Sequence, residues 1–318
     1  MATGTVMVAD LLRQCVHEAL RSAGADEASA QAATRAMMHA SCLGVDSHGV
    51  RLTPHYCAAL RGGRLKGTPA LSFMRMGPAA GMVDGDDGLG HLAAYAAMEH
   101  ACDMARENGI SAIGIRRSSH VGAAGAYALA GAQAGMISIF VTNSDSGVLP
   151  FDGTSAFHGT NPIAAAAPVE GSKPWLLDMA TSSIPFNRIL LYRDLGLPLP
   201  EDVAVDSDGV ATVDAARATA LLPLGGGAFG FKGAGLAGLV TILSAILTDA
   251  GVDDQLLPMA GPPDRPRNLG QFAIAIDPAM FPGGRDFGRT LAAYLDRLRS
   301  SPTRHAGQVM APGDREWI

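Results

Sequence analysis

Residues 225–233 read GGGAFGFKG, and the first six of them match the pattern Gly-x-Gly-x-x-Gly. In a Rossmann fold this pattern follows a buried strand, opens a helix on its third glycine, and precedes by about twenty positions an acidic residue at the end of the next strand. Here the preceding stretch AARATALLPL is helix-like and broken by Pro223, and Asp249 lies at the end of an expected helix. A chain with 39 glycines also matches so short a pattern easily by chance. The stretch therefore predicts a fold other than the Rossmann fold, with a flexible glycine loop that delivers Lys232 and the amides of the next helix to an anion.

Outward from this stretch, the sequence alternates between helical and strand patterns. Apolar periodicity and terminal glycines predict helices at roughly 9–23, 27–43, 54–63, 89–109, 123–135, 184–195, 234–249 and 286–299. Asp26 is the expected N-cap of the second helix, and Gly109 is expected to end the fourth. Short apolar runs predict buried strands at ISAIGI, MISIFV, NPIAAAAPV, WLLDMA and QFAIAI. The chain is thus of the α/β class with helical ends, and these ends are expected to pack together as one discontinuous domain, with boundaries near 75 and 282.

Composition limits the classes of function. Hydrophobic residues make up 48% of the 318 residues and charged residues only 17%, which favours an oligomer that hides part of the surface. The net charge of −6, without any run of Lys and Arg, argues against nucleic acid or an anionic membrane as the partner. The apolar stretch LAGLVTILSAILT is too short to span a bilayer and predicts a buried helix. Four cysteines without metal-ligand spacing, and a start that does not resemble a signal peptide, predict a cytoplasmic protein with reduced, mostly buried thiols.

Three stretches carry residues suited to chemistry. The loop DSHGVR, residues 46–51, combines a histidine that can exchange a proton with an arginine that can grip a carboxylate, although a solvated turn is the alternative. His120 follows the strand ISAIGI and precedes a helix start rich in Ala and Gly, where backbone amides can approach an anion; a hydrogen-bonded loop histidine is the alternative. Asp178 ends a strand and is expected either to cap the helix 184–195 or to bind a ribose hydroxyl. Without HExxH or CxxC pairs, no metal site is expected.

Eight motifs occur in one order: DSHGVR, SSHVGAAGAYA, HGTNP, LLDMATS, LLPLGG, FKGAGLA, QFAIAIDP and APGD. In this set the chain resembles, over nearly its whole length, the malate/L-lactate/L-sulfolactate dehydrogenase family, which includes ureidoglycolate and diketogulonate dehydrogenases and cyclic imino-acid reductases. The resemblance implies hydride transfer between NAD or NADP and a small 2-hydroxy acid or 2-oxo acid, in a homodimer. It also implies a mixed-sheet, non-Rossmann NAD(P)-binding domain at 76–282, and a helical domain for substrate binding and dimerisation at 1–75 with 283–318. A cyclic imino acid is the alternative substrate, and a catalytically silent binding relative is the alternative from another class.

The resemblance further implies roles for individual residues. Ser47, His48 and His120 correspond to catalytic positions, and Arg51 and Thr160 to substrate-binding positions. The positions implied to contact the cofactor are His120, Gly122, Ser144, Asp178, Met179, Ala180, Lys232, Gly233, Pro312, Gly313 and Asp314.

The sequence departs from the family pattern at three points. Many members place the carboxylate-binding arginine four residues after the histidine, whereas here Leu52 stands at that position and Arg51 precedes it. The acidic residue that completes a relay in some imine reductases lies about ten positions after the Asp178 equivalent, where this chain has PFNR. After LLPLGG, the usual Gly-Tyr-Gly helix start is replaced by GGGAFGFKG.

Overall fold

The computed structural model describes residues 7–304 and 307–317, so the outermost residues of the predicted helical domain lie outside the described residues. Within them the centre is a seven-stranded sheet in the order β1-β2-β3-β9-β4-β5-β6. Only β2 and β3 pair in parallel; the other neighbours are antiparallel. The strands are β1 (Ser72–Arg75), β2 (Ala80–Asp84), β3 (Ile110–Ser118), β4 (Ile137–Thr142), β5 (Ile163–Ala167), β6 (Trp175–Met179) and β9 (Leu269–Ile276). This mixed sheet confirms the predicted α/β class and is not a Rossmann sheet, whose strands are mostly parallel.

Both faces of the sheet are covered by helices. Helices α4 (Gly90–Asn108) and α5 (Gly125–Gln133) pack on one face, where Ile113 and Ile115 of β3 enter the main core. Helix α8 (Phe231–Thr241), continued by a π turn over Ile242–Ile246, packs on the other face against alternate residues of the same strands. The alternation follows from the two-residue period of a strand. As predicted, Gly109 ends α4 in the left-handed conformation that favours glycine.

The amino-terminal helices form a second core beside the sheet. Helices α1 (Ala9–Ser22), α2 (Glu27–Cys42) and α3 (Thr53–Arg61) bury Leu20, Met37 and Tyr56 against one another, and α2 also packs on α4. The Asp26 side chain accepts a hydrogen bond from the Ser29 N–H, which confirms it as the N-cap of α2. The DSHGVR loop packs against α2 and α3.

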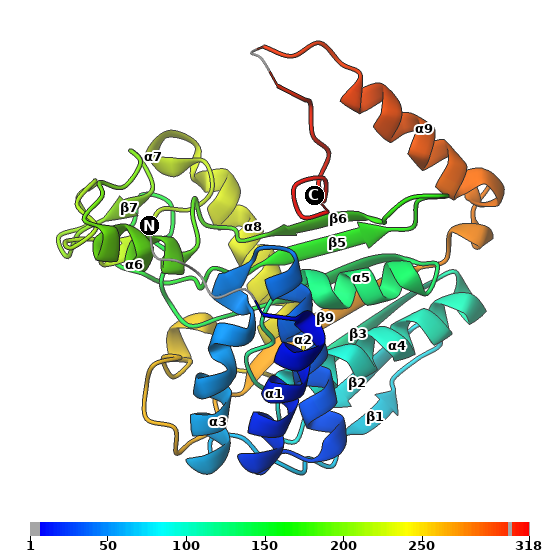
Figure 1. The fold of residues 1–318 in the computed structure, drawn as a ribbon, viewed down its shortest axis with the longest axis horizontal. Coiled ribbons are helices and arrows are strands. Elements are labelled where there is room, and N and C mark those ends of the chain that lie inside the picture. Colours follow the sequence, from blue (N-terminus) through cyan, green and yellow to red (C-terminus); the bar gives the residue numbers. More distant parts are fainter. Residues whose placement is uncertain (1–6, 305–306, 318) are drawn as a thin grey trace.

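A smaller lobe is inserted between β6 and α8. It contains α6 (Phe186–Leu195), the short strands β7 (Ala204–Val205) and β8 (Ala220–Leu221), and its own apolar cluster around Ile189 and Leu221. Figure 1 shows this lobe at one end of the sheet and helix α9 (Phe287–Arg299) at the other. Within a single chain α9 thus lies away from α1 and α3 (Figure 1), so the predicted packing of the two chain ends as one domain stays a prediction.

Three local predictions are corrected, and two strands were not predicted. The stretch GGGAFGFKG is not a flexible loop: it forms the short helix α7 (Gly226–Phe229) and runs directly into α8. The predicted buried helix 234–249 is buried on one side only. Cys15 and Cys42 are exposed, whereas Cys57 and Cys102 are buried. The sequence also gave no sign of β1 and β2, because β1 is an exposed edge strand without a regular apolar alternation. Among the described helices, none is both long enough and apolar enough to cross a membrane.

Candidate active site

His48 lies in a tight loop between α2 and α3. Two short 3₁₀ turns, Asp46–His48 and Val50–Leu52, are joined at Gly49, which packs so closely on Ser41 that a Cβ would overlap the Ser41 hydroxyl. The Ser41 Oγ also accepts the Val50 N–H at 3.0 Å, so the loop is fixed on α2. The Ser47 Oγ lies 2.8 Å from His48 Nδ1. Burial lowers the pKa of His48 below its ordinary value, so the ring is neutral near pH 7.

His120 stands next to His48. It follows β3 at the entrance to α5, and the two imidazole rings are 5.8 Å apart and nearly parallel. His120 Nδ1 contacts the Tyr56 hydroxyl at 2.7 Å and the Gly122 N–H at 3.3 Å. Burial is the largest cause that lowers the pKa of His120 well below its ordinary value. Tyr56 was not among the predicted residues, although it follows the DSHGVR loop by only five positions.

Behind this pair lies a third histidine that the sequence did not single out. His91 is fully buried in the first turn of α4, and its ring packs edge-on against Tyr56 with the centroids 4.8 Å apart. Neither of its ring nitrogens has a hydrogen-bond partner among the described residues. Burial lowers its pKa to about 3, so the ring that packs against Tyr56 is uncharged.

Asp178 does not cap the helix that follows it, which was one of its two predicted roles. At the end of β6, its Oδ2 accepts the Gly125 N–H of α5 at 2.8 Å, and α6 has no side-chain cap. The start of α5, expected to receive an anion from outside, thus receives a carboxylate from the protein. Its side chain is accessible to solvent, yet surrounding protein atoms displace enough water to raise its pKa to about 6, while the Gly125 hydrogen bond lowers that pKa.

Thr160 and Ser144 are joined in the segments just before β5 and just after β4. The Ser144 Oγ accepts the Thr160 N–H at 3.0 Å, and the Thr160 carbonyl accepts the Thr181 N–H at 2.9 Å. Thr181 in turn accepts the Leu224 N–H, and Leu224 accepts the Gly233 N–H at the start of α8. The HGTNP, LLDMATS and FKGAGLA motifs are therefore held together by main-chain hydrogen bonds.

The remaining predicted residues differ in whether another side chain already binds their charged group. Lys232 is exposed, its Nζ lying over the rings of Phe229 and Phe231 at 5.2 and 5.8 Å, and no ion pair engages it within the described residues. Asp314, in contrast, is gripped by the Arg299 guanidinium at 2.7 and 3.0 Å, which holds its pKa below the usual range. The APGD segment lies on β6, where Pro312 accepts the Leu176 N–H and Gly313 packs on the same residue. Asp314 therefore fixes this segment.

Two arginines near the two histidines differ in exposure and in their partners. Arg51 is exposed on the second 3₁₀ turn, and Leu52 packs against the amino-terminal core. Arg267, which the sequence did not single out, is buried, ion-paired with Asp145, and close enough for its charge to lower the pKa of His120. The structure therefore leaves Arg51 free to bind a ligand and engages Arg267 internally.

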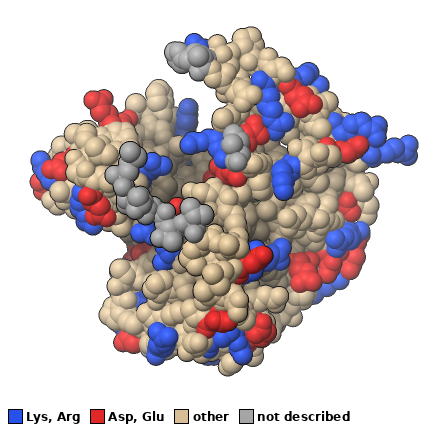
Figure 2. Space-filling view, viewed as in Figure 1, with Lys and Arg blue, Asp and Glu red and all other residues tan. Residues whose placement is uncertain are grey.

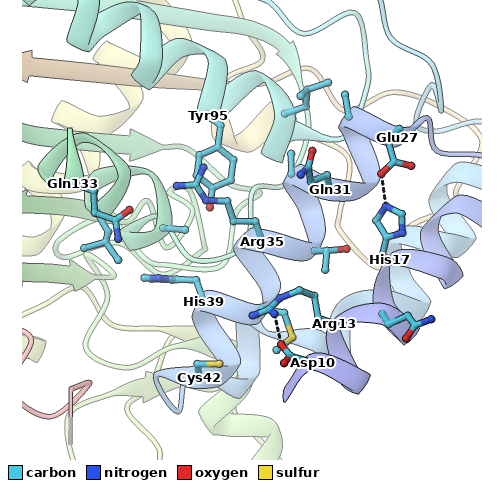
Figure 3. A pocket seen from close by; sticks show the side chains of 18 residues that line it. Asp10, Arg13, His17, Glu27, Gln31, Arg35, His39, Cys42, Tyr95 and Gln133 are labelled. Atoms are coloured by element: carbon cyan, nitrogen blue, oxygen red, sulfur yellow. Dashed lines mark hydrogen bonds and ion pairs between the residues drawn. The ribbon is translucent and has the colours of Figure 1, made fainter. Parts of the chain in front are cut away.

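Cavity volume alone would place the active site in another part of the molecule. A cavity of about 1060 Å³ lies between α1, α2, α4 and α5 (Figure 3), and none of its lining residues is a predicted site residue. Its cations Arg13 and Arg35 face a mixed wall that includes Asp10 and Glu27, and the Arg35 guanidinium lies 4.2 Å above the Tyr95 ring. The polar groups that converge on His48 and His120, rather than this cavity, mark the candidate active site.

Comparison with known proteins identifies the family of this chain. Residues 7–318 match the model of the family described as malate/L-lactate dehydrogenase. The malate dehydrogenase of Pyrococcus abyssi is 36% identical over 298 residues, which cover 92% of this chain and 81% of that protein. The structure of sulfolactate dehydrogenase from Methanocaldococcus jannaschii superposes with a TM-score of 0.91 at 32% identity, covering 98% and 90% of the two chains. The Δ1-piperideine-2-carboxylate reductase of Pseudomonas syringae pvar. tomato gives 0.89 at 28% identity, covering 99% and 92%.

The chain belongs to the malate/L-lactate dehydrogenase family. It is accordingly an NAD(P)-dependent oxidoreductase that acts on a small 2-hydroxy acid, 2-oxo acid or related imine. As a member of this family it needs groups that fit a dinucleotide. The Asp178 carboxylate can accept hydrogen bonds from ribose hydroxyls, and the free ammonium of Lys232 can pair with a phosphate. The LLDMATS segment packs on the start of α8, where a Cβ on Gly233 would meet the Thr181 carbonyl, and the chemistry of the residues present fits the cofactor.

Proposed function

We propose that His48 exchanges the proton in the oxidation of a small 2-hydroxy acid to its 2-oxo acid, with Ser47 orienting its ring. The observation that carries this proposal is the Ser47 Oγ at 2.8 Å from Nδ1, in a ring that burial keeps neutral. In the direction of oxidation the substrate O–H proton passes to Nε2 of His48, the hydrogen on the same carbon leaves with its electron pair, and a C=O bond forms. The oxidised cofactor, when bound, would serve as the hydride acceptor, and the reduced cofactor as the donor in the reverse direction. Within the described residues no carboxylate hydrogen-bonds Ser47, whose carbonyl accepts from Asn187 at 3.3 Å.

Binding roles follow from the same contacts. We assign Arg51 to the substrate carboxylate because its guanidinium is exposed beside the His48 loop, and Thr160 to the substrate because Ser144 and Thr181 fix it. For the cofactor, Lys232 and Gly233 supply the phosphate side, and Asp178, Met179 and Ala180 the ribose side. The other proposed cofactor contacts are Gly122, Ser144, His120, Pro312, Gly313 and Asp314.

A cyclic imino acid is the second candidate substrate, favoured by the similarity to the solved Δ1-piperideine-2-carboxylate reductase. It needs the same two elements: a cation for the carboxylate and a group that protonates the atom bonded to the reacting carbon, here an imine nitrogen. A catalytically silent relative is the alternative of another class, and the intact Ser47, His48, His120, Asp178 and Lys232 argue against it.

The test combines a substrate panel with one variant. The purified protein is mixed with NAD⁺ or NADP⁺ and a series of 2-hydroxy acids, and with NADH or NADPH and 2-oxo acids or cyclic imines, and the absorbance of the reduced nicotinamide is followed. His48→Asn should reduce kcat by about 10²–10⁴, as for a lost general acid or base, while leaving the fluorescence titration with NADH or NADPH unchanged. Full activity of this variant would remove His48 from the reaction.

We further propose a cytoplasmic homodimer. Leu239, Ile242, Ile246 and Leu247 are each about half exposed or more on the outer side of α8 and its π turn. Figure 2 shows wide uncharged areas on the visible face, which fits the low content of charged residues. The four cysteines are free thiols, which supports a reducing compartment.

Sedimentation velocity tests the dimer. Ile246→Glu should convert a dimer of the wild-type chain to monomer, whereas Val210→Glu, at an equally exposed apolar residue of the small lobe, should not. A monomeric wild-type protein, or a dimer unaffected by Ile246→Glu, would contradict the proposal for this surface.

A further inference from the structure

The hydrogen bonds at His120 determine which of its ring nitrogens carries the proton. Nδ1 lies 3.3 Å from the Gly122 backbone nitrogen and 2.7 Å from the Tyr56 hydroxyl. A backbone N–H can only donate, so Nδ1 must offer its lone pair and cannot itself carry a hydrogen. The Tyr56 hydroxyl, which can donate or accept, is then also a donor to Nδ1. In a neutral ring the hydrogen must therefore sit on Nε2.

The surroundings keep this ring neutral. Burial opposes a positive charge on His120, and the charge of Arg267 acts in the same direction, as would any charge on the neighbouring His48, His91 or His55. These groups come from the segment before β9, the DSHGVR loop, the first turn of α4, and α3. No carboxylate is among the groups that shift its pKa. Charging His120 would also break its bond with the Tyr56 hydroxyl proton, since Nδ1 would become a donor.

Tyr56 is well built to hold this state. It is the largest fully buried side chain of α3, packed edge-on against His91, and burial raises its pKa so far that the hydroxyl keeps its proton. Its hydroxyl has no other hydrogen-bond partner among the described residues. Helix α3 thereby presents one fixed donor to His120.

His48 is bound differently. Its Nδ1 faces the Ser47 hydroxyl, which can accept an N–H or donate to a lone pair. His48 can therefore carry its hydrogen on either nitrogen, and its Nε2 can take up a proton and release it without breaking a fixed contact. The two stacked histidines are thus not equivalent.

We propose that His120 acts as a fixed hydrogen-bond donor through Nε2–H to an oxygen of the substrate, that Tyr56 is the positioning residue that maintains this tautomer, and that His48 alone exchanges the proton. The assignment rests on the proposed function only in naming the substrate as the acceptor. It separates two roles that the resemblance left together, because the motifs assign both histidines to the catalytic set.

The first experiment reads the tautomer directly and needs no substrate. In protein labelled with ¹⁵N-histidine, long-range ¹H–¹⁵N spectra near pH 7.5 should show His120 as a neutral ring with a protonated Nε2 and an unprotonated Nδ1. Loss of the signals in His120→Gln assigns them. In Tyr56→Phe only the longer Gly122 bond, at 3.3 Å, still favours this tautomer, so the Nδ1 signal should shift toward a mixture of the two tautomers. A His120 ring that is protonated on Nδ1, or charged, would overturn the proposal.

The second experiment compares variants by the reach of their amide groups. The Gln amide nitrogen lies near the position of a histidine Nε2, and that of Asn near Nδ1. His120→Gln should therefore keep kcat/KM within about tenfold, the value of roughly one hydrogen bond, whereas His120→Asn should lose at least about tenfold more. His48→Gln should lose about 10²–10⁴ because an amide cannot accept the proton.

The pH profile distinguishes positioning from a general structural effect. In the oxidation direction, the group that must be deprotonated is His48, so His120→Gln should keep the acidic limb of the wild-type kcat/KM profile. If His120→Gln falls as far as His48→Gln, or loses that limb, His120 is itself the proton acceptor and the proposal is wrong. If the wild-type protein turns over no member of the panel, the proposed function fails, while the spectra still decide the tautomer.

Discussion

The carboxylate of Asp253 offers the sharpest test of how the substrate side is held. It is completely buried in the 3₁₀ turn Asp253–Gln255. Its Oδ2 accepts from the Asn161 side chain at 2.6 Å, the Thr241 hydroxyl at 3.0 Å and the Gly159 N–H at 3.1 Å. His158 Nδ1 is 3.5 Å away, too far for a strong hydrogen bond. Two of these donors, Gly159 and Asn161, flank Thr160 in sequence, and the third, Thr241, belongs to α8, so the carboxylate ties the Thr160 segment to that helix.

The substitution Asp253→Asn keeps the volume and changes one contact decisively. The amide oxygen will take the Oδ2 position, where three donors meet, and the NH₂ will face the Asn143 Nδ2, which donates to Oδ1 at 3.1 Å. Asn143 cannot flip, since its Nδ2 also donates to the Gly251 carbonyl at 2.8 Å and its Oδ1 accepts from Gly270. One donor is therefore left facing another donor.

The cost follows from these contacts. An unsatisfied buried donor costs about 1–3 kcal/mol of unfolding free energy. The three retained hydrogen bonds also become weaker because their acceptor is no longer charged. This loss is partly offset because the variant does not bury a charge. The expected loss of unfolding free energy is about 2–4 kcal/mol, or roughly 4–8 °C in Tm for a chain of this size. Asp254→Asn is the matched control because the adjacent carboxylate is exposed, and it should stay within about 0.5 kcal/mol. In activity assays Asp253→Asn should raise KM for the substrate more than for the cofactor.

The pH dependence of the stability gives a second test of the role of Asp253. Burial alone would raise the pKa of Asp253, but the hydrogen bonds outweigh it and lower that pKa. An unfolded aspartate has a pKa of about 3.9, so the stabilisation is complete above about pH 5 and is lost as pH falls through the lower folded value. The stability gap between wild type and Asp253→Asn should therefore narrow in acid. A variant as stable as Asp254→Asn, or a gap that does not change with pH, would refute the reasoning.

Three further predictions concern ligand binding. Arg51→Met should raise KM for a carboxylate substrate by about tenfold or more, with little change in NADH or NADPH affinity, because one bidentate ion pair is lost; an unchanged KM assigns the carboxylate to another cation. Lys232→Met should weaken NADH or NADPH binding in a fluorescence titration more than Gly227→Ala does. A Cβ added at Gly227 would meet only the movable carboxylate of Asp202, at 2.9 Å. The reverse order would show that the glycines form a dinucleotide-binding turn. With a pKa of about 6, Asp178 should be fully charged only above about pH 7, so cofactor affinity should decline as pH falls through 6, and Asp178→Asn should remove that dependence.

The helices and most strands could be predicted because their signals are local. An N-cap such as Asp26, a terminal glycine such as Gly109, and the period of buried residues all act within a few positions of the chain. Strand β1 was missed because its side chains are exposed and its place depends on pairing with β2. The helical form of GGGAFGFKG was missed because glycine composition favours loops, whereas Gly225 and Gly226 here use positive φ angles to enter a helix.

In the site, motifs indicated which residues matter but not how they are connected. His48 and His120 were identified from their motifs, yet the Tyr56–His120 contact spans 64 positions and the Gly125–Asp178 contact spans 53. Asp178 was expected to act on the helix that follows it, since a sequence suggests only near neighbours. Its actual partner is the start of α5, which pairing of β5 with β4 and β6 brings beside it. Contacts of this kind depend on sheet order, which no local pattern specifies.

These contacts show a structural role for the small residues of HVGAAGAYA. Expected to let amides approach an external anion, they instead bring two amides to two side chains of the protein: Gly122 N–H to His120 Nδ1, and Gly125 N–H to Asp178 Oδ2. Gly122 has a positive φ of 68°, and a Cβ on Gly125 would lie 2.8 Å from the Asp178 carboxylate, so both positions need glycine for geometric reasons. Because one rigid turn fixes both the histidine beside the proton exchange and the carboxylate proposed for the ribose, the distance between the substrate and cofactor sites is set by the backbone of α5 rather than by flexible side chains.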